Sequence, residues 1–187
     1  MEQKKDWLES LDNKAENKGN KFKTLWQAIK FVLVSLIVTV IQLLLVNLMY
    51  FLMADYKEPL PSFLASIFTE ATMGEGNSNW GYVLPFLVSN LVANSVGYFL
   101  NKKKTFKSDA PVWNFVIYIV ILILLILFST WLQGVVANAL NKTGINVFVA
   151  LAPTIAAMAA GTLQMVTLFP LQKFVLLKEK KKEEVIE

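Results

Sequence analysis

The chain contains no cysteine, no histidine and no arginine. Without cysteine it forms neither a disulfide bond nor a thiolate metal site. Without histidine it lacks the commonest metal ligand and the side chain that titrates near neutral pH. Few groups therefore remain for hydrolytic or metal-dependent catalysis. We expect no enzymatic activity, no catalytic residue, no metal site and no cofactor.

Charged residues are also scarce, because they make up 17% of the chain while hydrophobic residues make up 55%. Soluble domains carry about 25% charged residues. The difference comes from apolar runs that contain no Asp, Glu, Lys or Arg, at about residues 31–53, 82–100, 112–132 and 147–171. A helix of roughly 20 apolar residues crosses the bilayer core. The sequence therefore predicts an all-α integral membrane protein with four transmembrane helices.

The lysines predict how these helices are oriented. Sixteen of the eighteen lysines lie before the first run, between the second and third runs, or after the fourth, and only Lys57 and Lys142 lie in the other two links. Cytoplasmic loops of membrane proteins carry the excess of positive charge. We therefore expect a multi-pass protein of the cytoplasmic (inner) membrane with both termini in the cytoplasm. The membrane domain is expected at residues 21–178, between a disordered cytoplasmic tail (1–20) and a charged cytoplasmic tail (179–187).

Side-chain amides interrupt three of the apolar runs. Asn90, Asn94 and Asn101 follow one face of the second run, because their spacing is close to whole helical turns. One interpretation is packing between helices, where such an amide contributes about 1 kcal/mol. The other is a polar route for a neutral, hydroxyl-rich group such as a sugar, because amides bind hydroxyls without carrying charge. The residues expected along that route are Gln42, Asn90, Asn94, Asn101, Gln164 and Gln172. The third run has few polar groups and is expected to face lipid.

Lysines stand where several runs meet the expected cytoplasmic surface. Those expected to bind the phosphate of a lipid are Lys30, Lys102, Lys103 and Lys173. Ammonium groups form charge-assisted hydrogen bonds with phosphate. The alternative is that these lysines only set the topology and contact anionic lipids. A neutral polar route beside a cationic interface is what a lipid-linked sugar phosphate requires.

A weak internal repeat relates the two halves of the chain. Residues 101–107 and residues 172–178 each consist of an amide residue, a lysine, four residues and a second lysine. The starts of the first and third runs also correspond, as Lys30-Phe31-Val32 and Asn114-Phe115-Val116. Each half would be a hairpin that begins and ends on the same side. The sequence therefore predicts two parallel hairpin repeats, related by an axis along the membrane normal.

The same segments resemble the GtrA-like family of small four-span membrane proteins. The resemblance rests on Lys30-Phe31-Val32-Leu33-Val34, on Asn101-Lys102-Lys103-Lys104-Thr105-Phe106 and on Gln172-Lys173-Phe174, and it extends over about residues 24–178. The chain is most similar to the teichoic-acid glycosylation proteins among them. The resemblance implies translocation of undecaprenyl-phosphate-linked monosaccharide across the cytoplasmic membrane, for glycosylation of a polysaccharide or teichoic acid outside it. Members often have an acidic residue in the first span, where this chain has Gln42.

Two other functions stay open at this point. The protein is either a flippase or a non-transporting accessory subunit of a membrane glycosyltransferase. A small multidrug-type exporter is disfavoured, because such transporters exchange protons on an intramembrane carboxylate that these runs lack. The expected partners are the polyprenyl-phosphate-linked sugar, membrane lipids, membrane glycosyltransferases and further copies of the chain, since four helices barely enclose a groove. No nucleic acid is expected.

Overall fold

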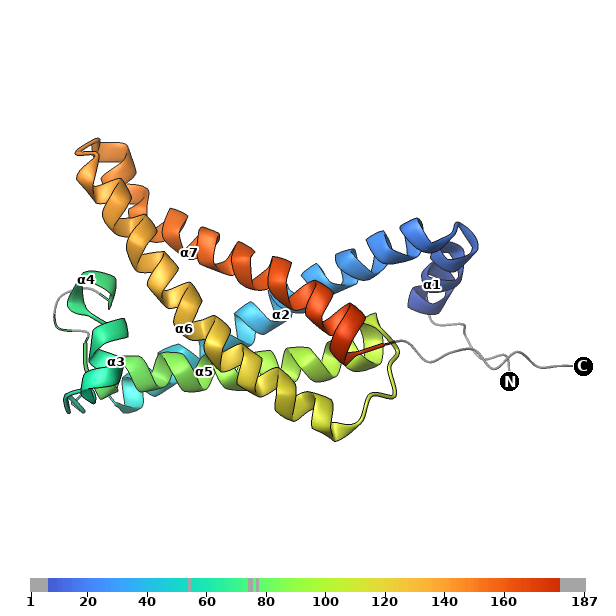
Figure 1. Ribbon diagram of the computed structural model, residues 1–187, viewed down its shortest axis with the longest axis horizontal. Helices are drawn as coiled ribbons and strands as arrows, with labels where there is room; N and C mark the ends of the chain where they lie inside the picture. The colour runs from blue at the N-terminus through green and yellow to red at the C-terminus, as the bar shows by residue number, and fades with distance from the viewer. Residues whose placement is uncertain (1–6, 54, 74–75, 77, 179–187) are drawn as a thin grey trace, which may run out of the picture.

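The computed structural model describes residues 7–53, 55–73, 76 and 78–178. In these residues the regular structure is helical, and no β-strand is present. The α-helices are α1 (Trp7–Asn17), α2 (Asn20–Leu52), α3 (Ser62–Ile67), α4 (Glu70–Met73), α5 (Trp80–Leu100), α6 (Val112–Lys142) and α7 (Asn146–Pro170) (Figure 1). Two π-helices, η1 (Asn101–Thr105) and η2 (Leu171–Leu176), continue α5 and α7.

Three helical segments of the described chain are long and apolar enough to cross a membrane. They are Asn20–Leu52, Trp80–Thr105 and Val112–Lys142. The prediction of a helical membrane protein is therefore confirmed. A further helix of 25 residues, α7, packs beside α6.

The long helices form two hairpins. α2 packs mainly along α5, and α6 packs mainly along α7, while fewer contacts join one hairpin to the other. In Figure 1, α2 and α6 run in one direction and α5 and α7 run back. α1, η1 and η2 consequently lie at the same end of the bundle, which we call the lysine-rich end. It carries Lys23, Lys30, Lys102, Lys103, Lys104, Lys107, Lys173 and Lys178.

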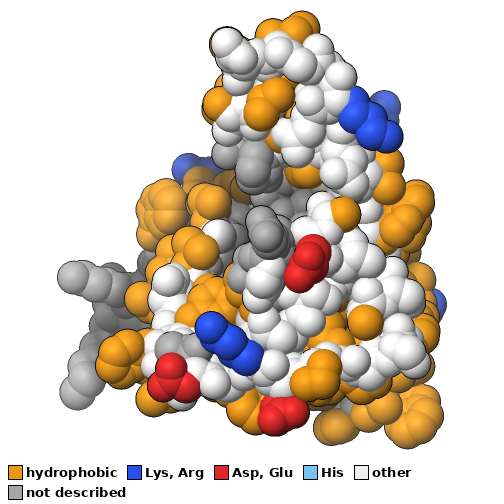
Figure 2. Space-filling model, turned by 90° about the vertical axis from the view of Figure 1, so that its left-hand side faces the viewer, with side chains coloured by type: hydrophobic (Ala, Val, Ile, Leu, Met, Phe, Trp, Pro, Cys, Tyr) orange, Lys and Arg blue, Asp and Glu red, His pale blue; other side chains and the backbone are white. Residues whose placement is uncertain are grey.

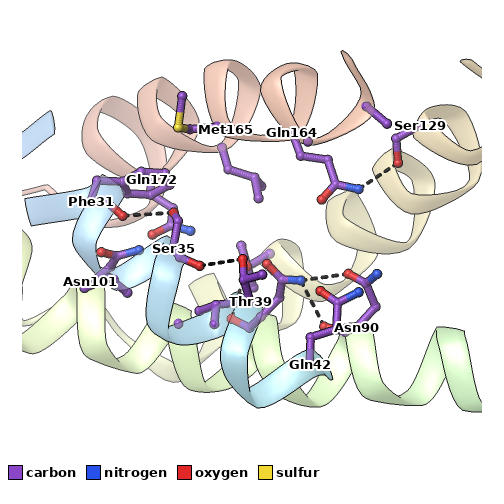
Figure 3. A pocket seen from close by; sticks show the side chains of 18 of the residues that line it. Phe31, Ser35, Thr39, Gln42, Asn90, Asn101, Ser129, Gln164, Met165 and Gln172 are labelled. Carbon is purple, nitrogen blue, oxygen red and sulfur yellow. Dashed lines mark hydrogen bonds between the residues drawn. The ribbon is translucent and has the colours of Figure 1, made fainter. Parts of the chain in front are cut away.

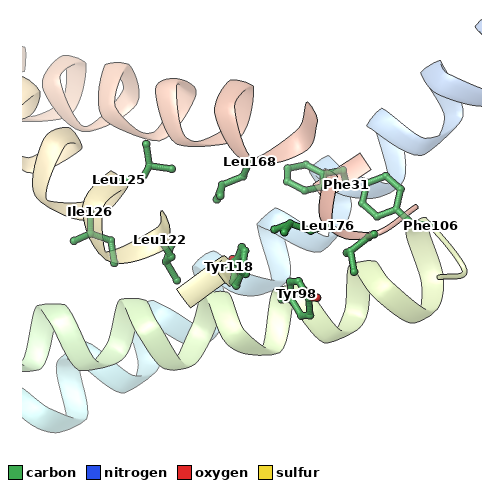
Figure 4. Packing of buried hydrophobic residues seen from close by; sticks show 10 residues of the cluster. Phe31, Tyr98, Phe106, Tyr118, Leu122, Leu125, Ile126, Leu168 and Leu176 are labelled. Atoms are coloured by element: carbon green, nitrogen blue, oxygen red, sulfur yellow. The ribbon is translucent and has the colours of Figure 1, made fainter. Parts of the chain in front are cut away.

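The hydrophobic core joins the two hairpins near the lysine-rich end (Figure 4). Tyr98 of α5 and Tyr118 of α6 are both 1% exposed, and their ring centroids are 4.7 Å apart. Phe31 of α2 meets Phe169 of α7 edge to face, with ring centroids 5.4 Å apart. Such aromatic pairs add about 0.5–1.5 kcal/mol to the burial of their surface. This core holds the helices together at one end, where the π-helices leave the bundle.

At the opposite end, α3 and α4 pack against α6. Phe68 and Val83 are fully buried there. The side chain of Asn79 caps α5 by accepting a hydrogen bond from the backbone N–H of Tyr82. Figure 2 views this end, and few lysine, aspartate or glutamate side chains are visible on it. The two ends therefore differ strongly in charge.

Two predicted segment boundaries are wrong. Disorder was expected over residues 1–20, but Trp7–Asn17 form α1, which packs on α2. The physical reason is a set of ion pairs between α1 and distant lysines, which composition alone does not reveal. α6 also continues to Lys142, beyond the end of the third apolar run at about position 132. Residues 1–6 and 179–187 of the two expected tails lie outside the described residues.

The prediction that the third apolar run faces lipid is wrong for one of its faces. Tyr118, Leu122 and Ile126 of α6 are at most 2% exposed, because they pack in the core between the hairpins. The other faces of α6 expose Val120 and Leu124, as expected of a helix that borders lipid. The long aliphatic composition of this run hides a buried stripe, because leucine and isoleucine suit both environments.

Candidate functional site: a polar cavity between the helices

A cavity of about 400 Å³ lies between α2, α5, α6 and α7. All six residues predicted for the polar route line it: Gln42, Asn90, Asn94, Asn101, Gln164 and Gln172 (Figure 3). The other polar residues of its lining are Ser35, Thr39, Tyr118, Ser129 and Thr130. None of the described lining residues is charged. The structure thus brings the amides of three apolar runs to one space.

On α5 the amides bind one another and their own helix. The amide nitrogen of Asn94 donates to the Oδ1 of Asn90 at 2.9 Å and to its backbone oxygen at 3.0 Å. Asn90 is 4% exposed and Asn101 is 3% exposed. Thr105 donates its hydroxyl to the Oδ1 of Asn101 at 2.8 Å. Tyr118 of α6 donates its hydroxyl to the backbone oxygen of Asn94 at 3.2 Å. These bonds fix the side of the cavity that α5 forms.

Hydroxyl groups supply much of the polarity on α2. Ser35 donates to the backbone oxygen of Phe31, and Thr39 donates to that of Ser35, both at 2.9 Å. The hydroxyl protons are thereby used within the helix, and the oxygen lone pairs remain to accept hydrogen bonds. Gly97 of α5 lets α2 approach closely here, because a Cβ atom at that position would lie 2.5 Å from Cγ2 of Val38.

The hairpin of α6 and α7 contributes residues that sequence reasoning missed. Gln164 of α7 donates its amide to the hydroxyl of Ser129 at 2.7 Å. Ser129 and its neighbour Thr130 are 3% and 4% exposed, and both hydroxyls donate to the backbone oxygen of Ile126. The sequence offers one indication of their position. Ser129 follows Tyr118 by eleven residues, which is close to three helical turns, so the two residues share a face of the helix.

Gln172 stands at the lysine-rich end of the cavity. Its side chain is 1% exposed, and within the described part of the chain its Oε1 accepts no hydrogen bond. A buried acceptor that stays unsatisfied costs about 1–3 kcal/mol.

The lysines predicted to bind phosphate do not form one site. Lys30 is 8% exposed and pairs with Asp12, while the exposed Lys103 lies beside it in a groove between α2 and η1. Lys102 donates to the backbone oxygen of Ala110. Lys173 lies apart, in a second pocket of about 460 Å³, where it donates to Thr24 at 2.6 Å. The lysine-rich end therefore has two separate cationic regions.

The repeat seen in the sequence corresponds to repeated contacts. In the first hairpin Lys30, at the third turn of α2, donates to the backbone oxygen of Lys104 in η1 at 3.0 Å. In the second hairpin Asn114, at the start of α6, donates to the backbone oxygen of Leu176 in η2 at 2.6 Å. The lysine after each amide bonds near the start of the other hairpin: Lys102 to Ala110, just before α6, and Lys173 to Thr24, in the first turns of α2. The halves thus share a pattern of contacts as well as a pattern of residues.

The chemistry available in the cavity is hydrogen bonding by neutral groups. Among the described residues, no cluster of three or more His, Cys, Asp or Glu side chains could hold a metal ion. Amides and hydroxyls both donate and accept hydrogen bonds, so they suit a ligand that bears several hydroxyl groups. No family model, no curated protein and no solved structure matches the chain.

Proposed function

We propose that this protein moves an undecaprenyl-phosphate-linked monosaccharide across the cytoplasmic membrane, to supply glycosylation of a polysaccharide or teichoic acid outside it. The observation that carries the proposal is the uncharged polar cavity between apolar helices. The sugar would cross through the cavity while the polyprenyl chain stays in lipid. The resemblance of residues 24–178 to the GtrA-like family supports the same substrate class.

The proposal includes a topology of four spans. α7 would be the fourth transmembrane helix, since it runs beside α6 over 25 residues. The lysine-rich end would lie in the cytoplasm, because positive charge gathers at that end of the helices. Both termini would then be cytoplasmic.

The lining of the cavity matches a sugar in chemistry and in size. Its volume of about 400 Å³ lies within the range of roughly 300–1,000 Å³ found for small-ligand pockets. Asn90, Asn94 and Asn101 lie along one wall, and Gln164 lies on α7. A hydroxyl-rich group would therefore exchange hydrogen bonds with both hairpins as it moves.

Transport would not be coupled to protons through the cavity. Proton-coupled carriers use an intramembrane carboxylate, and the described lining contains only neutral side chains. Net movement would follow from consumption of the lipid-linked sugar on the outer side.

The test is reconstitution of the purified full-length protein into liposomes that contain undecaprenyl phosphate carrying a radioactive hexose. A membrane-impermeant oxidant of vicinal diols reports the fraction of sugar on the outer surface over time. We expect the protein to accelerate transbilayer movement relative to protein-free liposomes. If movement stays at the protein-free rate and sugar delivery needs an added glycosyltransferase, the protein is an accessory subunit instead.

Matched asparagine variants test the role of the cavity. Asn94→Leu and Asn101→Leu each remove hydrogen bonds from the route, and a loss of about 1.4 kcal/mol corresponds to roughly a tenfold slower rate. Asn47→Leu is the control, because Asn47 is an exposed amide on α2 outside the cavity and donates to the backbone oxygen of Leu43 in its own helix. Equal rates for all three variants would mean that the cavity is not the route.

A further inference from the structure

The carboxylate of Asp12 on α1 is held by donors from two other parts of the chain. Its Oδ1 accepts hydrogen bonds from Lys30 Nζ at 2.7 Å and from Trp26 Nε1 at 2.6 Å. Its Oδ2 lies 2.8 Å from Lys107 Nζ. The side chain of Asp12 is 13% exposed, so this is a largely buried anion. Three donors thus converge on one negatively charged group.

Lys30 has a contact of its own that does not depend on Asp12. Lys30 also donates to the backbone oxygen of Lys104 at 3.0 Å, which ties it to η1. Lys107 has φ 48°, a left-handed conformation that is uncommon outside glycine and often occurs at functional sites. Charge-assisted donors of this kind bind carboxylate and phosphate oxygens alike. The site would therefore keep Lys30 if the carboxylate left.

A groove of about 410 Å³ leads away from this site along α2 and the end of α5. Near Asp12 its charged lining includes Lys103, Lys104 and Lys107 together with one further acid, Glu9. Farther along α2 it is lined by Leu33 and Ile37, which are 53% and 50% exposed. Cations at one end and aliphatic side chains along α2 fit a molecule with an anionic head and an apolar chain.

We propose that Trp26, Lys30 and Lys107 form a binding site for the phosphate group of a lipid, and that the carboxylate of Asp12 occupies this site until the lipid displaces α1. The apolar chain of the lipid would lie against Leu33 and Ile37. The N-terminal helix is then an internal competitor that keeps the site closed. The inference rests on the proposed function for the identity of the lipid, a polyprenyl phosphate that carries a sugar.

α1 is suited to leave the site as a unit. It has 11 residues and packs mainly on α2, and a helix of this length is marginal by itself in water. Gly19 separates it from α2 with φ 96°, a left-handed conformation that favours glycine. Burial tends to raise the pKa of Asp12, but hydrogen bonds from Lys107, Lys30 and Trp26 outweigh it and lower that pKa below 3.8. The competitor is therefore charged at neutral pH.

Removing the competing charge should open the site to ligand. The experiment titrates the full-length protein, in an uncharged detergent, with dioctanoyl phosphatidic acid and follows binding by native mass spectrometry. If α1 leaves the site open in about a tenth of the molecules, Asp12→Asn should tighten binding roughly tenfold. Glu70→Gln is the control for net charge, because it removes one negative charge from an exposed position on α4, outside the groove. We expect it to change the affinity by less than about twofold, as for an exposed charge.

Three further measurements decide the chemistry of the ligand. Dioctanoylglycerol, which lacks the phosphate, should not gain affinity from Asp12→Asn, and inorganic phosphate should bind much more weakly than the lipid to Asp12→Asn, because it cannot use the apolar part of the groove. Lys107→Gln added to Asp12→Asn should reverse the gain. An unchanged affinity in Asp12→Asn overturns the proposal, and an affinity for inorganic phosphate equal to that for phosphatidic acid overturns its assignment to a lipid.

The displacement of α1 is measured in a protein that keeps Asp12. Because the chain has no cysteine, Asn13→Cys on α1 and Val112→Cys at the start of α6 provide a unique pair of positions for spin labels. Phosphatidic acid should lengthen the distance between the labels, and binding without any change in that distance overturns the proposal. A protein that responds in this way but moves no sugar would retain the lipid site and lose the proposed function.

Discussion

Gly97 offers a direct test of how α2 and α5 form one side of the cavity. A Cβ atom at Gly97 would lie 2.5 Å from Cγ2 of Val38, which is 9% exposed. Valine is branched at Cβ and has one preferred rotamer in a helix, so its methyl group has little freedom to move aside. Gly97→Ala should therefore push α2 away from α5.

Gly161→Ala provides the reference for this change. Gly161 also lines the cavity, but a Cβ atom there would meet nothing within 4 Å. Both variants gain about 0.8–1.0 kcal/mol of helix propensity, because glycine is a poorer helix former than alanine. Only Gly97→Ala adds an overpacking cost of about 1–3 kcal/mol. The difference in stability between the two variants therefore measures the overpacking cost alone.

Thermal unfolding in detergent, followed by tryptophan fluorescence, measures the effect. For a chain of this size about 1 kcal/mol shifts the melting temperature by roughly 2–4 °C. We therefore expect Gly97→Ala to melt about 2–12 °C below Gly161→Ala. In a Val38→Ala background the cost of Gly97→Ala should largely disappear, because Cγ2 is gone. Equal melting temperatures for Gly97→Ala and Gly161→Ala would refute the close contact between α2 and α5.

Three other predictions concern topology, pH and assembly. A reporter fused after Glu187 and a second one inserted at Asn141 should report opposite sides of the membrane, with the first in the cytoplasm. If both reporters lie on the same side, the chain does not have four spans. The contacts of Asp12 lower its pKa while α1 is docked. The charged carboxylate therefore stabilises the docking of α1 in full above about pH 4. This stabilisation is lost as the pH falls through the lowered pKa. The distance between labels on α1 and α6 should therefore be constant from pH 8 to pH 5 and rise only below about pH 4, whereas a rise near pH 6 would contradict this cause. Cross-linking in nanodiscs should show a homo-oligomer, since exposed apolar side chains such as Leu44 and Phe51 need either lipid or a second copy, and an active monomer would refute it.

The residues of the cavity were largely predictable, because helical periodicity is local. Asn90, Asn94 and Asn101 share a face in any straight helix, and an apolar run of that length must be helical in a bilayer. Ser129 and Thr130 escaped prediction because two hydroxyls in a long aliphatic run look unremarkable. Their place in the cavity depends on how α6 turns toward α2, which no local pattern specifies.

The docking of α1 could not be predicted from composition. Trp7–Asn17 are polar and of mixed charge, which by itself favours disorder. What holds the helix is the contact of Asp12 with Lys30 and with Lys107, and Lys107 is far away in the sequence. The distribution of the lysines expected to bind phosphate over two regions could not be predicted either. Lys103 lies two residues after Asn101 and Lys173 directly follows Gln172, yet these lysines lie in different pockets because the halves face different neighbours.

The π-helices connect the two candidate sites. In η1, Asn101 lines the cavity and Thr105 lines the groove beside Lys30 and Lys103. The hydroxyl of Thr105 donates a hydrogen bond to the side chain of Asn101. In η2, Gln172 lines the cavity and the next residue, Lys173, lines the second cationic pocket. π-helical turns are rare and often occur at functional sites. A phosphate bound in the groove would thus be separated from the cavity by one pair of side chains, Thr105 and Asn101. The amide and lysine pattern that repeats in the sequence marks the two places where neutral and cationic surfaces meet.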